Sequence, residues 1–184
     1  MTALSPVIVD AFCRLCNGAY EGWSAHCALF PKQLTLADIK SQSASNGLVR
    51  LSIVSQEHLL HEICKLHDPA VQQSQVNLGI DYVVRFGGWD DATKRELLGL
   101  QTQLDALAAK LRKARNKILS HNDLETILEV ARLGQFPDGE DVEYFKNLQK
   151  FVNIVHHAVY PGDFIFNKCA SDEAAALLSL LKHD

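Results

Sequence analysis

Residues 91–121 read DATKRELLGLQTQLDALAAKLRKARNKILSH, and this stretch decides the fold. From Leu97 to Ile118, apolar or small residues recur at intervals of three and four, with Gln101 as one polar interruption of that stripe. The periodicity predicts one amphipathic helix over about residues 91–121. A helix of this size is on the order of 45 Å long, enough to span a small domain.

A long helix is also predicted at the N-terminus. Ser5 is a favourable N-cap, and Pro6 suits the first helical position. The helix is expected to carry Leu15 on its apolar face and to end at about Phe30, because the residue before a proline disfavours helical geometry. Pro31 then separates it from the next element.

Two helices are predicted between residues 47 and 88. The first opens after Gly47 and reaches Leu66, with Leu51 and Val54 among its apolar positions. Its start, VRLSIV, alternates as a strand does, but apolar positions continue to Leu66 and favour a helix. The second is a short helix over 76–86 that two glycines close.

The C-terminal part adds a helix that begins near residue 140, carries Val142 on its apolar face and ends before Pro161, and a tail helix over 171–182. The capping residue types around Ser120 predict a kink or restart of the long helix there. We therefore expect an all-α, up-down helical bundle of about five to seven helices, forming one domain over residues 1–184.

Composition excludes several classes of protein. The 184 residues are 47% hydrophobic and 22% charged, close to the soluble average, and no apolar run is long enough for a membrane helix. The five cysteines are an odd number, and the N-terminus lacks a secretory pattern, so we expect a cytoplasmic protein. A formal net charge of −4 means that any site for polyanions has to be local.

Such a local site is suggested by residues 110–117. They hold five basic side chains, namely Lys110, Arg112, Lys113, Arg115 and Lys117, and no acidic residue lies between Asp105 and Asp123. A strip of this kind attracts phosphates through an interaction that weakens with salt. The alternative is a solvated helix end, where positive charge is favourable to the helix dipole.

The order Arg115, Asn116, then His121 adds chemistry to that strip. Cleavage of RNA without metal needs proton transfer, which histidine performs near neutral pH, and a cation that holds phosphoryl charge, which arginine provides. On an ideal helix Arg115 and His121 lie about 240° apart. They converge where the helix breaks or where two copies meet, which points to a homodimer.

Three stretches of the sequence resemble a known family. The stretch RNKILSHNDLETIL, together with EGWSAHCALF and KLHDPAVQQSQVNL, is similar to the abortive-infection (AbiU2-like) subgroup of the HEPN domain family. The resemblance implies an R-x4-6-H motif of metal-independent endoribonucleases, with Arg115 and His121 catalytic and Asn116 in a supporting role. The subgroup often has Asp where this chain has Asn116.

The resemblance also implies how such a protein acts. Its active site would form between two protomers, it would need no cofactor, and its partner would be a nucleotidyltransferase-type antitoxin. The leading hypothesis is thus a toxin or abortive-infection effector that cleaves RNA. The backbone of this RNA would be bound by Arg112, Lys113 and Lys117. The alternatives are a non-catalytic helical module that binds RNA, a nucleotide or a protein, and a dimerisation module whose basic strip faces solvent.

A metal site is not expected. His58, His61, Cys64 and His67 recur every three residues, but such steps drift about 60° around a helix, so the four side chains do not meet one ion. The Cys13-x2-Cys16 pair is better explained by buried thiols that act as small hydrophobic groups.

Overall fold

The computed structural model describes residues 4–119 and 139–182, and for Leu36 and residues 113–119 it describes the backbone only. This part of the chain contains six α-helices: α1 (Pro6–Leu29), α2 (Gln42–Leu66), α3 (Ile80–Phe86), α4 (Asp91–Leu119), α6 (Glu140–His157) and α7 (Cys169–Leu181). A 3-10 turn (Leu36–Asp38) precedes α2, and two antiparallel two-residue strands, β1 (Val71–Gln72) and β2 (Gln75–Val76), follow it. The prediction of an all-α bundle is confirmed.

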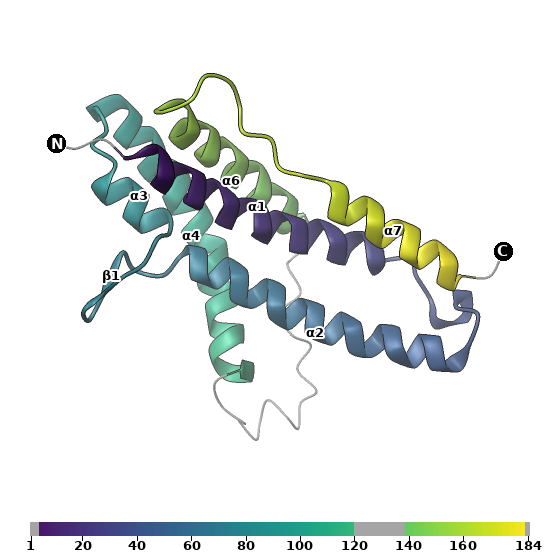
Figure 1. Cartoon of the computed structure of the whole chain (residues 1–184). Coiled ribbons are helices and arrows are strands. Elements are labelled where there is room, and N and C mark those ends of the chain that lie inside the picture. The colour runs from purple at the N-terminus through teal and green to yellow at the C-terminus, as the bar shows by residue number, and fades with distance from the viewer. Residues whose placement is uncertain (1–3, 120–138, 183–184) are drawn as a thin grey trace.

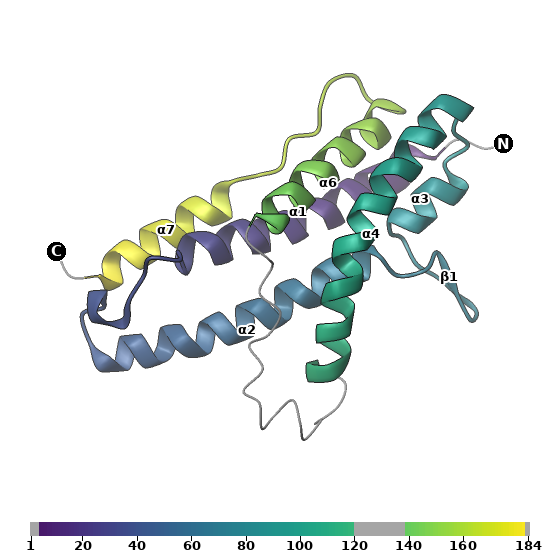
Figure 2. The same cartoon turned by 180° about the vertical axis from the view of Figure 1, so that it is seen from behind.

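The helices are arranged as a broad end and a narrower arm (Figure 1). At the broad end α1, α3, α4 and α6 lie together with the second half of α2. In the arm, α7 packs along α1, and the first half of α2 continues beside them. Helix α4 crosses α2, and its last turns extend past it, as both views show (Figures 1 and 2).

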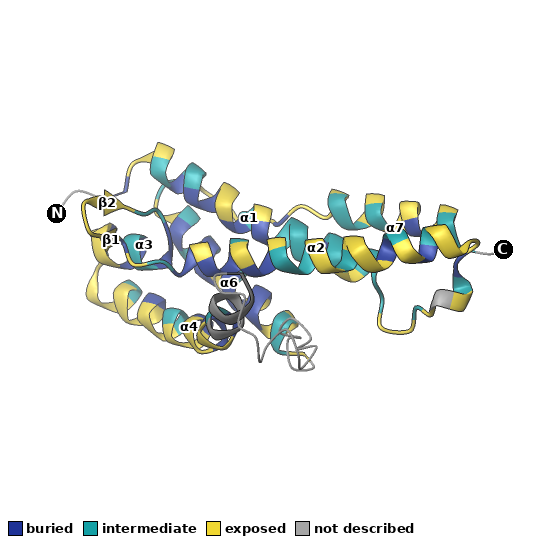
Figure 3. Ribbon diagram, turned by 90° about the horizontal axis from the view of Figure 1, so that it is seen from below, coloured by how far each residue is buried: buried dark blue, intermediate teal, exposed yellow. Residues whose placement is uncertain are grey.

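The main hydrophobic core fills the broad end. Phe12 of α1 and Phe151 of α6 are fully buried, with their ring centroids 5.8 Å apart. Ile63 of α2 and Leu104 of α4 complete the contact between the four helices. In Figure 3 the buried residues lie on the faces of the helices that meet there, while their outer faces are exposed. Burial of this core fixes how α2, α4 and α6 lie relative to one another.

A second, much smaller cluster closes the arm. Ile39, Leu48 and Leu178 are its buried members, from the segment before α2, from α2 itself and from α7. An isolated antiparallel bridge pairs Ile39 with Lys182 and ties the end of α7 to the same segment.

Helix α2 begins earlier than the sequence predicted. The prediction of a start after Gly47 was wrong, because Ser41 caps the helix at its N-terminus: its hydroxyl accepts a hydrogen bond from the Ala44 amide at 3.1 Å. The helical assignment of VRLSIV was right. Leu51 and Val54, however, are exposed, because the buried face of α2 in this half is the one that carries Leu48.

The predicted helix over 76–86 was wrong in its first four residues. Val76 is the last residue of strand β2, residues 77–79 form a short connection, and α3 starts at Ile80. Gly79 precedes α3 where a side chain has no room, since a Cβ atom at this position would lie 2.7 Å from the Leu66 carbonyl oxygen. This close approach seats α3 against the C-terminal end of α2.

Two predicted apolar faces were also misjudged. Leu15 is 40% exposed, because α1 turns Phe12, Cys13 and Cys16 toward the core instead. Val142 is 57% exposed in the first turn of α6, before the buried face begins at Tyr144. The tail helix α7 begins at Cys169, two residues before the predicted start. Among the described residues, no helix is long and apolar enough to cross a membrane.

Candidate functional site

Two of the predicted catalytic residues, Arg115 and Asn116, lie near the end of α4. The backbone of α4 is helical through positions 115 and 116, up to Leu119. The side chains of Lys113, Arg115, Asn116 and Lys117 and all of His121 lie outside what the structure describes. The convergence of Arg115 with His121, and the kink near Ser120, therefore stay predictions.

Two members of the basic strip bind other parts of the chain. Lys110 Nζ donates to Glu140 Oε1 at 2.8 Å and to Oε2 at 2.9 Å, which links α4 to the start of α6. Arg112 Nη2 donates to the His67 carbonyl oxygen at 2.6 Å and lies 4.0 Å from Asp68 Oδ1. These two cations connect α4 to α6 and to the end of α2, and part of their charge is balanced by acidic residues.

The buried imidazole of His67 links the three helices α2, α4 and α6. Its contact on α4 lies just before the basic strip. His67 is the C-cap of α2, and its side chain is 1% exposed. Its Nδ1 lies 2.6 Å from Asp105 Oδ1 of α4, and its Nε2 lies 2.8 Å from Tyr144 Oη of α6. A carboxylate next to Nδ1 favours a proton on that nitrogen, so Nε2 of the neutral ring accepts from the Tyr144 hydroxyl.

The tyrosine in this arrangement keeps its proton. Burial, and then the nearby thiols of Cys16 and Cys64 and the Asp105 carboxylate, raise the pKa of Tyr144 well above its ordinary value. The Tyr144 hydroxyl therefore keeps its proton near neutral pH and can donate it to a hydrogen bond. We call Tyr144, His67 and Asp105 the buried triad, without implying a catalytic role.

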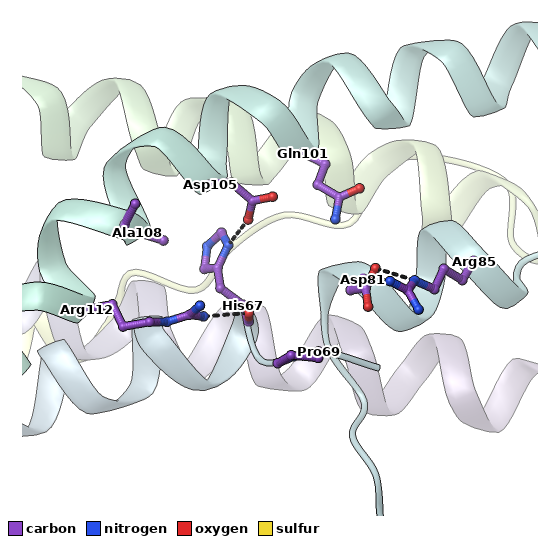
Figure 4. A pocket seen from close by; sticks show the side chains of 9 residues that line it. His67, Pro69, Asp81, Arg85, Gln101, Asp105, Ala108 and Arg112 are labelled. Carbon is purple, nitrogen blue, oxygen red and sulfur yellow. Dashed lines mark hydrogen bonds and ion pairs between the residues drawn. The ribbon is translucent and has the colours of Figure 1, made fainter. Parts of the chain in front are cut away.

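The Asp105 end of the buried triad opens into a pocket of about 310 Å³ (Figure 4). Its lining comes from α4, α3 and the end of α2: His67, Pro69, Asp81, Arg85, Gln101, Asp105, Ala108, Ala109 and Arg112. The side chains of Gln101 and Asp105 extend from α4 toward the loop that carries His67 and Pro69 (Figure 4).

Both arginines of the pocket are held in place. Arg85 Nε donates to Asp81 Oδ1 at 2.7 Å, and Asp81 Oδ2 in turn accepts from the Ala70 amide at 2.8 Å. Arg112 is fixed by the His67 carbonyl, yet its Nε is buried and has no hydrogen-bond partner among the described residues. Unpaired buried donors are uncommon in folded proteins.

Sequence reasoning missed this pocket. His67 was considered as one member of a three-residue repeat, and Asp105 as the acidic limit of the basic strip. One signal was present: Gln101 interrupts the apolar stripe of α4, and it lines the pocket. The contact between His67 and Tyr144 joins positions 77 apart, and no local pattern predicts such a pair.

The cysteines of the core are not arranged for metal. Within residues 4–119 and 139–182, no group of three His, Cys, Asp or Glu side chains lies together as an ion site. Burial and the nearby Asp10 carboxylate raise the pKa of Cys13 to about 11, and burial also raises that of Cys16. Both thiols therefore stay protonated near neutral pH and behave as small apolar groups.

The described helices define the class of the protein as an all-α helical bundle with a long helix that carries a basic C-terminal end. Comparison with family models makes the assignment specific. The model of the HEPN family described as AbiU2 matches residues 9–177, and the chain belongs to this family. Comparisons with curated proteins and with solved structures give no match.

Proposed function

We propose that the protein is a metal-independent endoribonuclease that acts as a toxin or abortive-infection effector. Membership of the AbiU2 family carries this proposal, since the matched residues 9–177 include both members of the R-x4-6-H motif, Arg115 and His121. The continuous helix α4 supports it, because it presents positions 115 and 116 in its last turns.

The proposed reaction is a transesterification within the RNA chain. A base removes the proton of a 2′-hydroxyl, the 2′-oxygen attacks the adjacent phosphorus, and the bond from phosphorus to the 5′-oxygen breaks. A proton delivered to that 5′-oxygen completes the step and leaves a 2′,3′-cyclic phosphate and a 5′-hydroxyl. His121 transfers protons, and Arg115 stabilises the negative charge on the phosphorane.

The remaining predicted residues act around this centre. Asn116 orients the reacting groups, and Arg112, Lys113 and Lys117 hold the RNA backbone. We infer an active site shared by two protomers, because Arg115 and His121 diverge on a straight helix. The last turns of α4 extend past α2 (Figure 2), and we place the shared active site there.

The first experiment is incubation of the purified protein with end-labelled RNA in EDTA. Wild type is expected to cleave it and leave 2′,3′-cyclic phosphate ends. His121→Ala is expected to reduce the rate by about 100-fold or more, the usual contribution of an acid–base group, and Arg115→Ala to reduce it comparably. His58→Ala is the matched control, because His58 is an exposed histidine of α2, and it should leave the rate unchanged.

The results separate the hypotheses. Full activity in both His121→Ala and Arg115→Ala would show that the assigned roles are wrong. Intact RNA with every variant, combined with binding that weakens as salt rises, would favour the non-catalytic module. Sedimentation of the wild type tests the dimer, and co-purification with a nucleotidyltransferase-type protein would test the proposed antitoxin.

A further inference from the structure

The pocket beside the buried triad lies on the face of α4 that leads toward positions 115 and 116. Gln101, Asp105, Ala108 and Arg112 follow one another at helical spacing along the pocket. Positions 115 and 116 come one turn after Arg112 on that face of the helix. Asp105 is ten residues before Arg115, which corresponds to about 15 Å along the helix axis. A group bound at Asp105 is therefore separated from the phosphodiester bond that would be cleaved near Arg115.

The pocket has the size of a site for one small group. Its volume of about 310 Å³ lies at the lower end of the range of small-molecule pockets, roughly 300–1,000 Å³. An RNA strand does not fit inside it, whereas one unstacked base does. Sequence-specific recognition of RNA commonly takes this form, with a base turned out of the strand and bound by its Watson–Crick edge.

The central acceptor of the pocket is held in a fixed position. The Asp105 side chain is 50% exposed, and one of its oxygens is 2.6 Å from Nδ1 of the buried His67. The hydrogen bond from Tyr144 fixes the other side of that imidazole. The carboxylate is therefore oriented toward the pocket before any ligand arrives, and it presents acceptors only.

The hydrogen-bond donors of the pocket lie at its two ends. Arg112, next to positions 115 and 116, lines one end with a side chain that is 38% exposed, and Arg85 stands on α3 at the opposite end. Gln101 contributes an amide that both donates and accepts. A ligand that fits this set has adjacent N–H donors for the carboxylate, and a phosphate for the arginine near the motif.

Among the RNA bases, guanine meets these requirements best. Its N1–H and N2 amino group are neighbouring donors that pair with a carboxylate. Adenine and cytosine offer a single exocyclic amino group on this edge, and uracil places two carbonyl oxygens beside its N3–H, which a carboxylate repels.

We propose that the pocket is a base-recognition subsite for a guanine of the substrate RNA, close to but distinct from the scissile phosphate. Asp105 accepts from guanine N1–H and N2–H, and Arg112 donates to the neighbouring phosphate. This inference rests on the proposed ribonuclease function and adds a sequence preference to it. Asp105 is a specificity residue in this scheme, and His67 and Tyr144 position it.

The test uses RNA oligonucleotides that contain one guanine in an otherwise uniform context, and matched oligonucleotides with inosine or uracil in its place. Inosine keeps N1–H and lacks the N2 amino group, so it removes one of the two hydrogen bonds. Wild type is expected to cut at a fixed distance from guanine, with a preference over uracil of roughly 5- to 150-fold, the range for a good bidentate contact. The rate of cleavage of the inosine RNA should lie between the rates for the guanine and the uracil RNA.

Asp105→Asn is the decisive variant. Its side-chain oxygen still accepts from His67 Nδ1, so the buried triad is preserved, while its NH2 group opposes the guanine donors. The preference for guanine should fall to within about twofold, through a lower rate of cleavage of the guanine RNA. Glu96→Gln, which removes a charge from an exposed position of the same helix, is the control and should keep the preference.

The failures are distinguishable. If wild type cleaves RNA without a base preference at a fixed position, or if Asp105→Asn keeps that preference, the subsite is refuted and the ribonuclease stands. If wild type cleaves no RNA, the proposed function fails, and fluorescence anisotropy with the same oligonucleotides then tests the pocket directly. Tighter binding of guanine that Asp105→Asn abolishes would support the subsite, and equal binding of all oligonucleotides would overturn it.

Discussion

The two hydrophobic clusters are built from the same kinds of side chain but differ in how many elements enclose them. Four long helices surround the core around Phe12 and Phe151, and the seven-residue helix α3 covers one side. The cluster around Leu178 has three buried residues in the described part of the chain, under the pair formed by α7 and the start of α2. The number of surrounding helices, more than composition, therefore decides how deeply an apolar residue is buried.

The course of α2 makes the same point within a single helix. Its second half enters the large core through Leu60 and Ile63, whereas Leu51 and Val54 in its first half are exposed. The buried triad begins at His67, at the end of the half that is enclosed. The candidate site is thus supported by the well-packed end, and the arm contributes no residue to it.

The largest expected effect comes from truncation in the large core. Phe151→Ala should lower the free energy of unfolding by about 3–5 kcal/mol, because the ring is fully buried and its removal leaves a cavity. Chemical denaturation measures this, with Lys150→Ala as an exposed control on the same helix. If the alanine variant does not fold, Phe151→Leu provides a smaller truncation. A loss below about 1 kcal/mol would contradict the packing described for α1 and α6.

Truncation in the arm should cost less. Leu178→Ala is expected to lower the free energy of unfolding by about 2 kcal/mol, near the minimum for a buried leucine, because few neighbours surround it. Leu180→Ala on the same helix is the control, since Leu180 is 71% exposed and should change stability by less than about 0.5 kcal/mol. Equal losses for Phe151→Ala and Leu178→Ala would remove the distinction between the two clusters.

Sequence periodicity predicted the helices well because most of them are long. Helix α4 was expected from residue 91, and the alternation at VRLSIV was correctly interpreted as helix. The hairpin before α3 was missed, since two-residue strands have no periodic pattern. Leu15 and Val142 were placed on buried faces because helical spacing defines a stripe and says nothing about how far along the helix that stripe is covered.

The candidate site also has one part that the sequence could predict and one part that it could not. The order of Arg115 and His121 is local in sequence and could be found there. The buried triad joins residues from α2, α4 and α6, which only the packing of the broad end brings together. The sequence pattern alone would predict that the polar residues of the buried triad face solvent.

A smaller effect is expected from the buried triad itself. Tyr144→Phe keeps the ring but leaves His67 Nε2 without its donor, so the free energy of unfolding should fall by about 1–2 kcal/mol near neutral pH. Because burial raises the pKa of Tyr144, the unfolded chain loses this proton first as pH rises. The tyrosine's contribution is present below its ordinary pKa near 10 and is lost above it. Denaturation at pH 8 and pH 10.5 should therefore show a narrowing gap between the two proteins, whereas a constant gap would contradict this role for the hydroxyl.

The smallest effect is expected at the ion pair between α4 and α6. Lys110 and Glu140 are in contact at 2.8 Å, but their side chains are 59% and 37% exposed, so water screens the attraction. Lys110→Met should therefore lower the free energy of unfolding by only about 0.2–1 kcal/mol, and added salt should shrink the difference. A loss as large as that of Leu178→Ala would mean that charge holds the end of α4 more than packing does. The variant also separates structure from RNA binding: if RNA affinity falls while stability is almost unchanged, Lys110 serves the basic strip as well as the fold.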